Sequence, residues 1–213
     1  MGLTFDVGAA ITAFVLIFPA ELPDKTFIAT LVMATRLRPL PVWLGVSAAF
    51  VVQCAIAVAA GGLLSLLPHR LVAALSAALF AGGAFILIKG GLEARAEALA
   101  EEQQEAEETE SLLRQRTGRN LSFGRTVATS FGVIFVAEWG DLSQLLTAAL
   151  AARTGKPLAV GVGSWLALAA VAGLGVLIGR WLVERVPIHR VRLISGAALA
   201  VLALLAVTEA VRG

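Results

Sequence analysis

Charged residues are missing from long stretches of this sequence. Residues 39–88 contain only three ionisable side chains, those of Cys54, His69 and Arg70, and residues 157–179 contain none. The chain is 58% hydrophobic with a mean hydropathy of +0.86, well above the range of soluble globular domains. Because uncharged runs long enough to cross the hydrocarbon core recur along the chain, we predict an all-α polytopic membrane protein.

Other absences exclude whole classes of function. The single cysteine, Cys54, cannot form an internal disulfide or a thiol redox pair. The sequence has no P-loop signature, which argues against an ATP-driven pump. The net charge of +2 is small, and nothing indicates a nucleic-acid partner. The start of the chain lacks a basic region and carries Asp6, so we expect the first apolar segment to remain as a membrane span.

Six apolar segments are long enough to be transmembrane helices, and we predict that all six span the cell membrane. They cover residues 6–33, 42–66, 71–91, 124–150, 158–182 and 191–210. The connection at 93–120 holds eight Glu and four Arg, so we predict a solvated helix or a flexible tether there. The positive-inside rule favours both termini outside and this acidic loop in the cytoplasm, because most Lys and Arg of the connections then lie inside.

The two halves of the chain repeat each other. A shift of 117 residues places 14–36 on 131–153, with nine of 23 positions identical. Each half contains three predicted spans, an odd number, so the second half enters the membrane upside down relative to the first. Many secondary transporters have this inverted-repeat plan. We therefore predict a first three-helix repeat at 1–92, the acidic loop at 93–122 and a second three-helix repeat at 123–213.

Four acidic residues lie inside the repeated spans. They are Glu21 and Asp24 in the first copy, and Glu138 and Asp141 in the second. A carboxylate at the centre of a span costs about 2.5–3.5 kcal/mol on insertion scales, so a structural role does not account for four of them. A spacing of three puts both acids of a copy on one helix face. We expect the inverted repeat to bring the two faces together at the midplane.

Such a cluster of carboxylate oxygens suits a hard divalent cation such as Mn²⁺ or Ca²⁺. Thr26, Ser143 and Gln144 are further candidate ligands. Lys25 is a candidate for tuning the site or for simply neutralising a neighbour, and Gln53 for tuning the site or bonding between helices. An emptied cluster should take up protons, so metal and protons compete for the same oxygens. We expect no cofactor besides the transported ion, and a homodimer is a candidate assembly.

The duplicated motif resembles a known family signature. ELPDKT at 21–26 and EWGDLS at 138–143 are similar to E-x-G-D-[KR]-[TS], the signature of the Gdt-type calcium/manganese transporter family (uncharacterised-protein family 0016). The resemblance covers essentially the whole chain. It implies export of Mn²⁺ or Ca²⁺ from the cytosol in exchange for protons, with the motif acids as ligands, and manganese efflux in a bacterial member. Two positions depart from the signature: Pro23 replaces a glycine and Leu142 replaces a basic residue.

A membrane-embedded enzyme that uses a metal, such as a lipid-phosphate hydrolase, is the alternative function. Phosphate chemistry calls for an arginine or a nucleophile beside the acids, whereas Lys25 is the only basic residue near the two motifs in the sequence. We therefore favour a secondary transporter over an enzyme.

Overall fold

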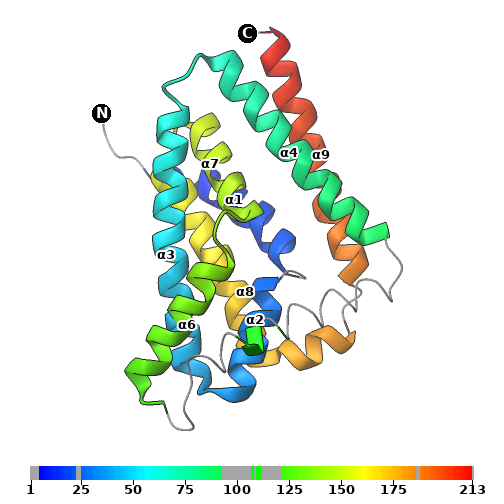
Figure 1. Ribbon diagram of the computed structural model, residues 1–213. Helices are drawn as coiled ribbons and strands as arrows, with labels where there is room; N and C mark the ends of the chain where they lie inside the picture. Colours follow the sequence, from blue (N-terminus) through cyan, green and yellow to red (C-terminus); the bar gives the residue numbers. More distant parts are fainter. Residues whose placement is uncertain are drawn as a thin grey trace.

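The computed structural model describes residues 5–22, 25–92, 107, 109–111, 121–185 and 188–212, and the secondary structure of these residues is helical. The helices, in chain order, are α1 (Val7–Glu21), α2 (Lys25–Arg36), α3 (Pro39–Leu64), α4 (His69–Leu92), α6 (Phe123–Ala137), α7 (Leu142–Thr154), α8 (Pro157–Arg185) and α9 (Ile188–Arg212) (Figure 1). The prediction of an all-helical chain is confirmed for this part of the chain.

Local sequence signals explain several helix boundaries. Asp6 caps α1, since its side chain accepts a hydrogen bond of 3.0 Å from the Ala9 amide. Prolines open α3 and α8 at Pro39 and Pro157, where a missing amide hydrogen leaves no bond unmade. Gly155 ends α7 in the left-handed conformation, with φ of 62°.

Three helices are long and apolar enough to cross a membrane. They are Pro39–Leu64, Arg70–Lys89 and Pro157–Leu177, and they match the predicted spans at 42–66, 71–91 and 158–182. Within α9, the apolar stretch Ala197–Thr208 is shorter than a span requires. The described helices thus provide three spans, or up to five if each of two bent pairs counts as one, and the sixth span at 191–210 stays a prediction.

The predicted helices at 6–33 and 124–150 are each divided in two, so the prediction of one helix per segment is corrected. The first segment is divided into α1 and α2, whose axes differ by 68°, and the second into α6 and α7, whose axes differ by 75°. Hydropathy reports only which residues avoid water, and a straight span and a broken one have the same apolar composition. Both breaks fall at the acidic motifs, so these motifs lie at helix ends rather than in the middle of continuous helices.

Helices α3 and α8 form the centre of the packing. Both broken pairs rest on them: α3 packs on α6 and α7, and α8 packs on α1 and α2. Two indole N–H groups join α3 to α8, because Trp43 donates to the Ala169 carbonyl at 2.9 Å and Trp165 donates to the Ser47 carbonyl at 3.1 Å. Helices α4 and α9 pair with each other beside this group (Figure 1).

Glycines let several helices approach closely, and besides Gly61, which meets the Ala148 carbonyl oxygen of α7, two of them lie next to the helices that lead into the breaks. A Cβ added to Gly45 of α3 would clash with the Val127 carbonyl oxygen of α6, and one added to Gly163 of α8 would clash with the Ala10 carbonyl oxygen of α1. Small residues at such crossings are the usual basis of tight helix packing in membranes. These two crossings therefore fix the positions of α6 and α1, the helices that lead into the two breaks.

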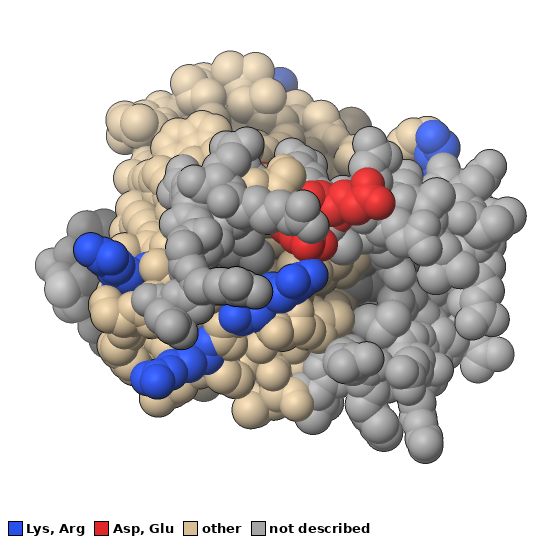
Figure 2. Space-filling view, turned by 60° about the horizontal axis from the view of Figure 1, so that its bottom comes forward, with Lys and Arg blue, Asp and Glu red and all other residues tan. Residues whose placement is uncertain are grey.

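Between residues 93 and 120 of the acidic loop, only residues 107 and 109–111 are described. Glu110 forms an ion pair of 3.0 Å with Arg36 at the end of α2, and Thr109 is buried. The Arg36 side chain is 63% exposed, so the pair contributes at most about 1 kcal/mol. Figure 2 shows acidic and basic side chains next to each other on this face. Glu110 thus contacts the end of α2, and the role of the loop as a tether stays a prediction.

Candidate metal centre

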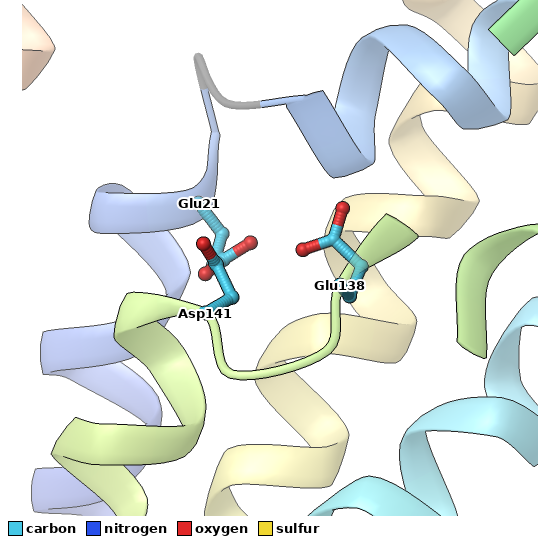
Figure 3. Close-up of side chains that lie close together, drawn as sticks. All are labelled: Glu21, Glu138 and Asp141. Carbon is cyan, nitrogen blue, oxygen red and sulfur yellow. The ribbon is translucent and has the colours of Figure 1, made fainter. Parts of the chain in front are cut away.

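Three carboxylates from different helix ends converge in the structure. Glu21 is the last residue of α1, Glu138 follows α6 and Asp141 precedes α7. One carboxylate oxygen from each lies within 4.8 Å of the other two, and the three side chains point toward one another (Figure 3). Glu21 and Glu138 are each only 2% exposed. The predicted convergence of the two motifs is therefore seen for these three residues.

The two acids of the second motif are brought together by a turn. Glu138 ends α6 with its amide bonded to the Ile134 carbonyl, Gly140 has a φ of 79°, and Asp141 is the N-cap of α7. The expectation that Glu138 and Asp141 share one face of a continuous helix is wrong, because the residues between them are not helical. The turn brings their carboxylates together instead.

Gly140 is the point at which this turn requires glycine. A φ of 79° lies in the left-handed region that other residues adopt only at a cost, although a Cβ there would meet no atom within 4 Å. We expect Gly140→Ala to destabilise the protein by about 1 kcal/mol and Gly140→Asn by less, since asparagine tolerates this conformation. Thermal unfolding of the two purified variants in detergent measures this. Equal stabilities of Gly140→Ala and wild type would show that the turn does not depend on glycine.

Gln144 spans the same turn from the first turn of α7. Its amide nitrogen donates to the Glu138 carbonyl at 2.6 Å, and its amide oxygen accepts from the Gly140 backbone N–H at 3.3 Å. The sequence predicts a metal ligand at this position. The hydrogen bonds to the turn could not be foreseen from the sequence, because they depend on the helix break.

The structure describes the side chains of three of the other predicted site residues, but not those of the remaining two. Thr26 and Ser143 are buried in the first turns of α2 and α7, and the hydroxyl of Thr26 has no hydrogen-bond partner among the described residues. Gln53 is buried and donates to the Phe135 carbonyl of α6 at 3.3 Å, the interhelical bond foreseen as its second role. Asp24 and the side chain of Lys25 lie outside the described residues.

The electrostatics of this cluster call for positive charge. At an effective dielectric constant of about 20, two ionised carboxylates at this separation repel by on the order of 3 kcal/mol. The three acids carry −3 when all are ionised, and one divalent cation reduces this to −1. Carboxylate oxygens are the ligands that hard divalent cations prefer. The arrangement can therefore hold a divalent cation, or protons in its place.

The chain also matches a known family on both sides of the acidic loop. Residues 9–95 and 126–213 match the family model described as the divalent cation/proton antiporter GDT1. The chain belongs to the GDT1 family. This confirms the resemblance seen in the duplicated motif. GDT1 is a family of transporters rather than enzymes, so the hydrolase alternative receives no support.

Curated relatives of the GDT1 type occur in plants and cyanobacteria. The chain is 32% identical to the protein PAM71, chloroplastic, of Arabidopsis thaliana, over 94% of this chain and 56% of the relative. It is 33% identical to the GDT1-like protein 1, chloroplastic, of Oryza sativa subsp. japonica, over 82% and 55%. It is 30% identical to a GDT1-like protein of Synechocystis, over 87% and 92%.

The chain thus spans about half the length of the plant relatives and nearly all of the cyanobacterial one. No solved structure matches the chain.

Proposed function

We propose that this chain is a secondary transporter that exports a divalent cation from the cytosol in exchange for protons. Mn²⁺ is the preferred ion and Ca²⁺ the next. The observation that carries this proposal is the convergence of two buried carboxylates, Glu21 and Glu138, with the half-buried Asp141 at the ends of broken helices. Broken helices with binding groups at the break are typical of secondary transporters.

The donor set supports a hard cation. Glu21, Glu138 and Asp141 supply carboxylate oxygens, and we propose Asp24 as the fourth acid by its equivalence to Asp141 in the repeat. Thr26 and Ser143 would supply neutral oxygens from the first turns of α2 and α7. A set made only of oxygen atoms suits Mn²⁺ or Ca²⁺ better than a softer metal.

Proton exchange follows from the same charges. When the cation leaves, carboxylates that are crowded and removed from water need another source of positive charge, and protons are the available one. Binding of the next cation then requires release of those protons. We propose that Lys25 adjusts the number of protons exchanged, because it adds one positive charge next to Asp24 in the sequence.

Matched contacts in the two halves support an inverted repeat with its halves at 1–92 and 123–213. Gly45 of α3, in the first half, lies against α6 of the second half, and Gly163 of α8, in the second half, lies against α1 of the first half. The two indole bonds between α3 and α8 are also reciprocal, since each tryptophan donates to a carbonyl on the other helix. We propose that the repeats span the cell membrane with both termini outside and the acidic loop in the cytoplasm.

A transport assay with purified protein tests the function. Proteoliposomes carrying a pH-sensitive dye inside should move Mn²⁺ when a pH gradient is applied, and the internal pH should change as the ion moves. Ca²⁺ in excess should compete, and Mg²⁺ should compete less. Collapsing the gradient with an ionophore should stop net transport, and protein-free liposomes provide the background. Movement of Mn²⁺ with no effect of the pH gradient and no change in internal pH would contradict proton exchange.

A further inference from the structure

We propose that Gln144 is a positioning residue: it holds Glu138 and Asp141 as one preset pair of carboxylates for the transported cation. The inference rests on the proposed function, since it assigns a role within the same site. It differs from the role of a direct ligand, for which an amide oxygen next to the acidic motif would be the first expectation.

The Glu138 carbonyl shows what the Gln144 amide does. This carbonyl lies at the end of α6, where the helix offers no further backbone donor. It accepts from Gln144 Nε2 at 2.6 Å and from the Asp141 amide at 3.3 Å, so both of its lone pairs are used. Without the Gln144 amide the carbonyl would keep only the longer bond from the Asp141 amide, and inside a membrane no bulk water can replace the lost partner. The side chain thus stabilises a turn that the backbone alone would leave incomplete.

The amide oxygen of Gln144 restrains the middle of the turn. Gln144 Oε1 accepts from the Gly140 N–H at 3.3 Å, and Gly140 is the residue with positive φ. One side chain therefore bonds to the backbone on both sides of Trp139. Because Glu138 and Asp141 flank these bonded groups, the direction of both carboxylates depends on the Gln144 amide.

The first copy of the repeat lacks this device. The equivalent position holds Phe27, which is 2% exposed and packs with Ile28 and Val171. A phenyl ring cannot donate to or accept from a backbone amide, so at this position only the second copy restrains its acidic motif by an amide. The second copy therefore supplies a preset half of the site.

Two substitutions separate a positioning role from a ligand role. Gln144→Met keeps the size of the side chain and removes both hydrogen bonds. Gln144→Glu keeps an oxygen facing Gly140 and adds a negative charge near the cation, but it cannot donate to the Glu138 carbonyl when ionised. A ligand role predicts that Gln144→Glu binds Mn²⁺ at least as well as wild type. A positioning role predicts that both variants bind it less well.

The readout is the KM for Mn²⁺ against the maximal rate in proteoliposomes. For Gln144→Met we expect KM to rise about tenfold, the loss expected from about 1.4 kcal/mol of hydrogen bonding, with a maximal rate within about twofold of wild type. Gln144→Glu should also raise KM. Thr154→Val is the matched control in the same helix, α7. The Thr154 hydroxyl donates to the Leu150 carbonyl at 2.7 Å and accepts from the Lys156 amide at 3.2 Å, so this variant also loses two bonds to the backbone, and its KM should equal that of wild type.

A second measurement separates this inference from the proposed function. Thermal stabilisation by added Mn²⁺ in detergent reports binding without transport, so it remains informative if wild type binds the ion but exchanges no protons. Unchanged Mn²⁺ affinity in Gln144→Met, or tighter binding in Gln144→Glu, overturns the positioning role. If Gln144→Met does not fold, Gln144→Glu and Gln144→Asn decide: the shorter amide of Gln144→Asn should weaken binding, and wild-type affinity in either variant overturns the inference.

Discussion

Replacing Glu138 with glutamine is expected to reduce Mn²⁺ transport in proteoliposomes to the level of protein-free vesicles. Glu138 is 2% exposed and its carboxylate lies within 4.8 Å of those of Glu21 and Asp141. Glutamine has nearly the same shape but lacks the charge that attracts the cation and the second oxygen that can bind it. It also cannot take up and release the proton. Both halves of the exchange should therefore fail.

Glu21→Gln is expected to have the same effect, because Glu21 supplies the carboxylate of the first copy. Neither variant should lose its fold. Removing one of three crowded negative charges relieves repulsion on the order of 3 kcal/mol per pair, so each metal-free variant should be at least as stable as the metal-free wild type in thermal unfolding. A loss of function with retained stability distinguishes a binding group from a structural one.

Glu110→Gln is the matched control for both substitutions. It makes the same chemical change in an acid that is partly exposed and paired with Arg36 on the surface, and we expect transport at the wild-type rate. Transport that survives in both Glu21→Gln and Glu138→Gln would rule out the convergent carboxylates as the cation site. A Mn²⁺ titration followed by thermal shift measures binding directly, and we expect Glu21→Gln and Glu138→Gln to lose Mn²⁺ binding as well as transport.

The acids of this site could be predicted from the sequence, because the free-energy cost of a carboxylate within an apolar segment depends only on residue type and position. Carboxylates inside apolar runs are rare enough to be conspicuous, and the repeat paired Glu21 with Glu138 without any structural knowledge. The type of secondary structure was also predictable, since only helices satisfy their own backbone within an apolar segment. What these signals share is that they depend on residue type and not on geometry.

The geometry of the helix breaks could not be predicted in this way. The first copy offers two helix-breaking prolines: Pro19 lies inside α1, which continues to Glu21, and only Pro23 falls in the sequence between α1 and α2. In the second copy Gly140 marks the turn, but an isolated glycine in an apolar helix is more often a packing residue. The bonds from Gln144 to the turn exist only because the helix is broken there. Geometry of this kind follows from the folded backbone, which no single residue type determines.

The largest effect on stability is expected at glycines where helices cross, and Gly45 and Gly163 have the closest backbone contacts. A Cβ at Gly163 would clash with the Ala10 carbonyl oxygen and lie 2.9 Å from the Ala10 Cα, and a Cβ at Gly45 would clash with the Val127 carbonyl oxygen. These contacts are with backbone, so no change of rotamer relieves them and the helices must separate. We expect Gly163→Ala and Gly45→Ala each to destabilise the protein by about 2–4 kcal/mol, at or above the usual cost of overpacking.

The same substitution should have the opposite sign elsewhere on the same helix. Gly62 lies within α3, and a Cβ there would meet no atom within 4 Å. Gly62→Ala should leave stability unchanged or raise it by up to about 1 kcal/mol, because alanine favours the helix over glycine. Thermal unfolding of all three variants in one detergent, followed by circular dichroism, compares them directly. Equal unfolding temperatures for Gly45→Ala and Gly62→Ala would contradict the close crossing of α3 and α6.

These two crossings also connect packing to the site. Gly163→Ala would push α1 away from α8, and α1 ends at Glu21; Gly45→Ala would push α6 away from α3, and α6 leads into Glu138. Each substitution should therefore weaken Mn²⁺ binding as well as stability, whereas Gly62→Ala should change neither measurably. If Gly163→Ala and Gly45→Ala destabilise the protein but leave its Mn²⁺ affinity unchanged, the carboxylates are positioned by the turns alone. Weakened binding in both variants would show that helix packing on α3 and α8 sets the distance between Glu21 and Glu138.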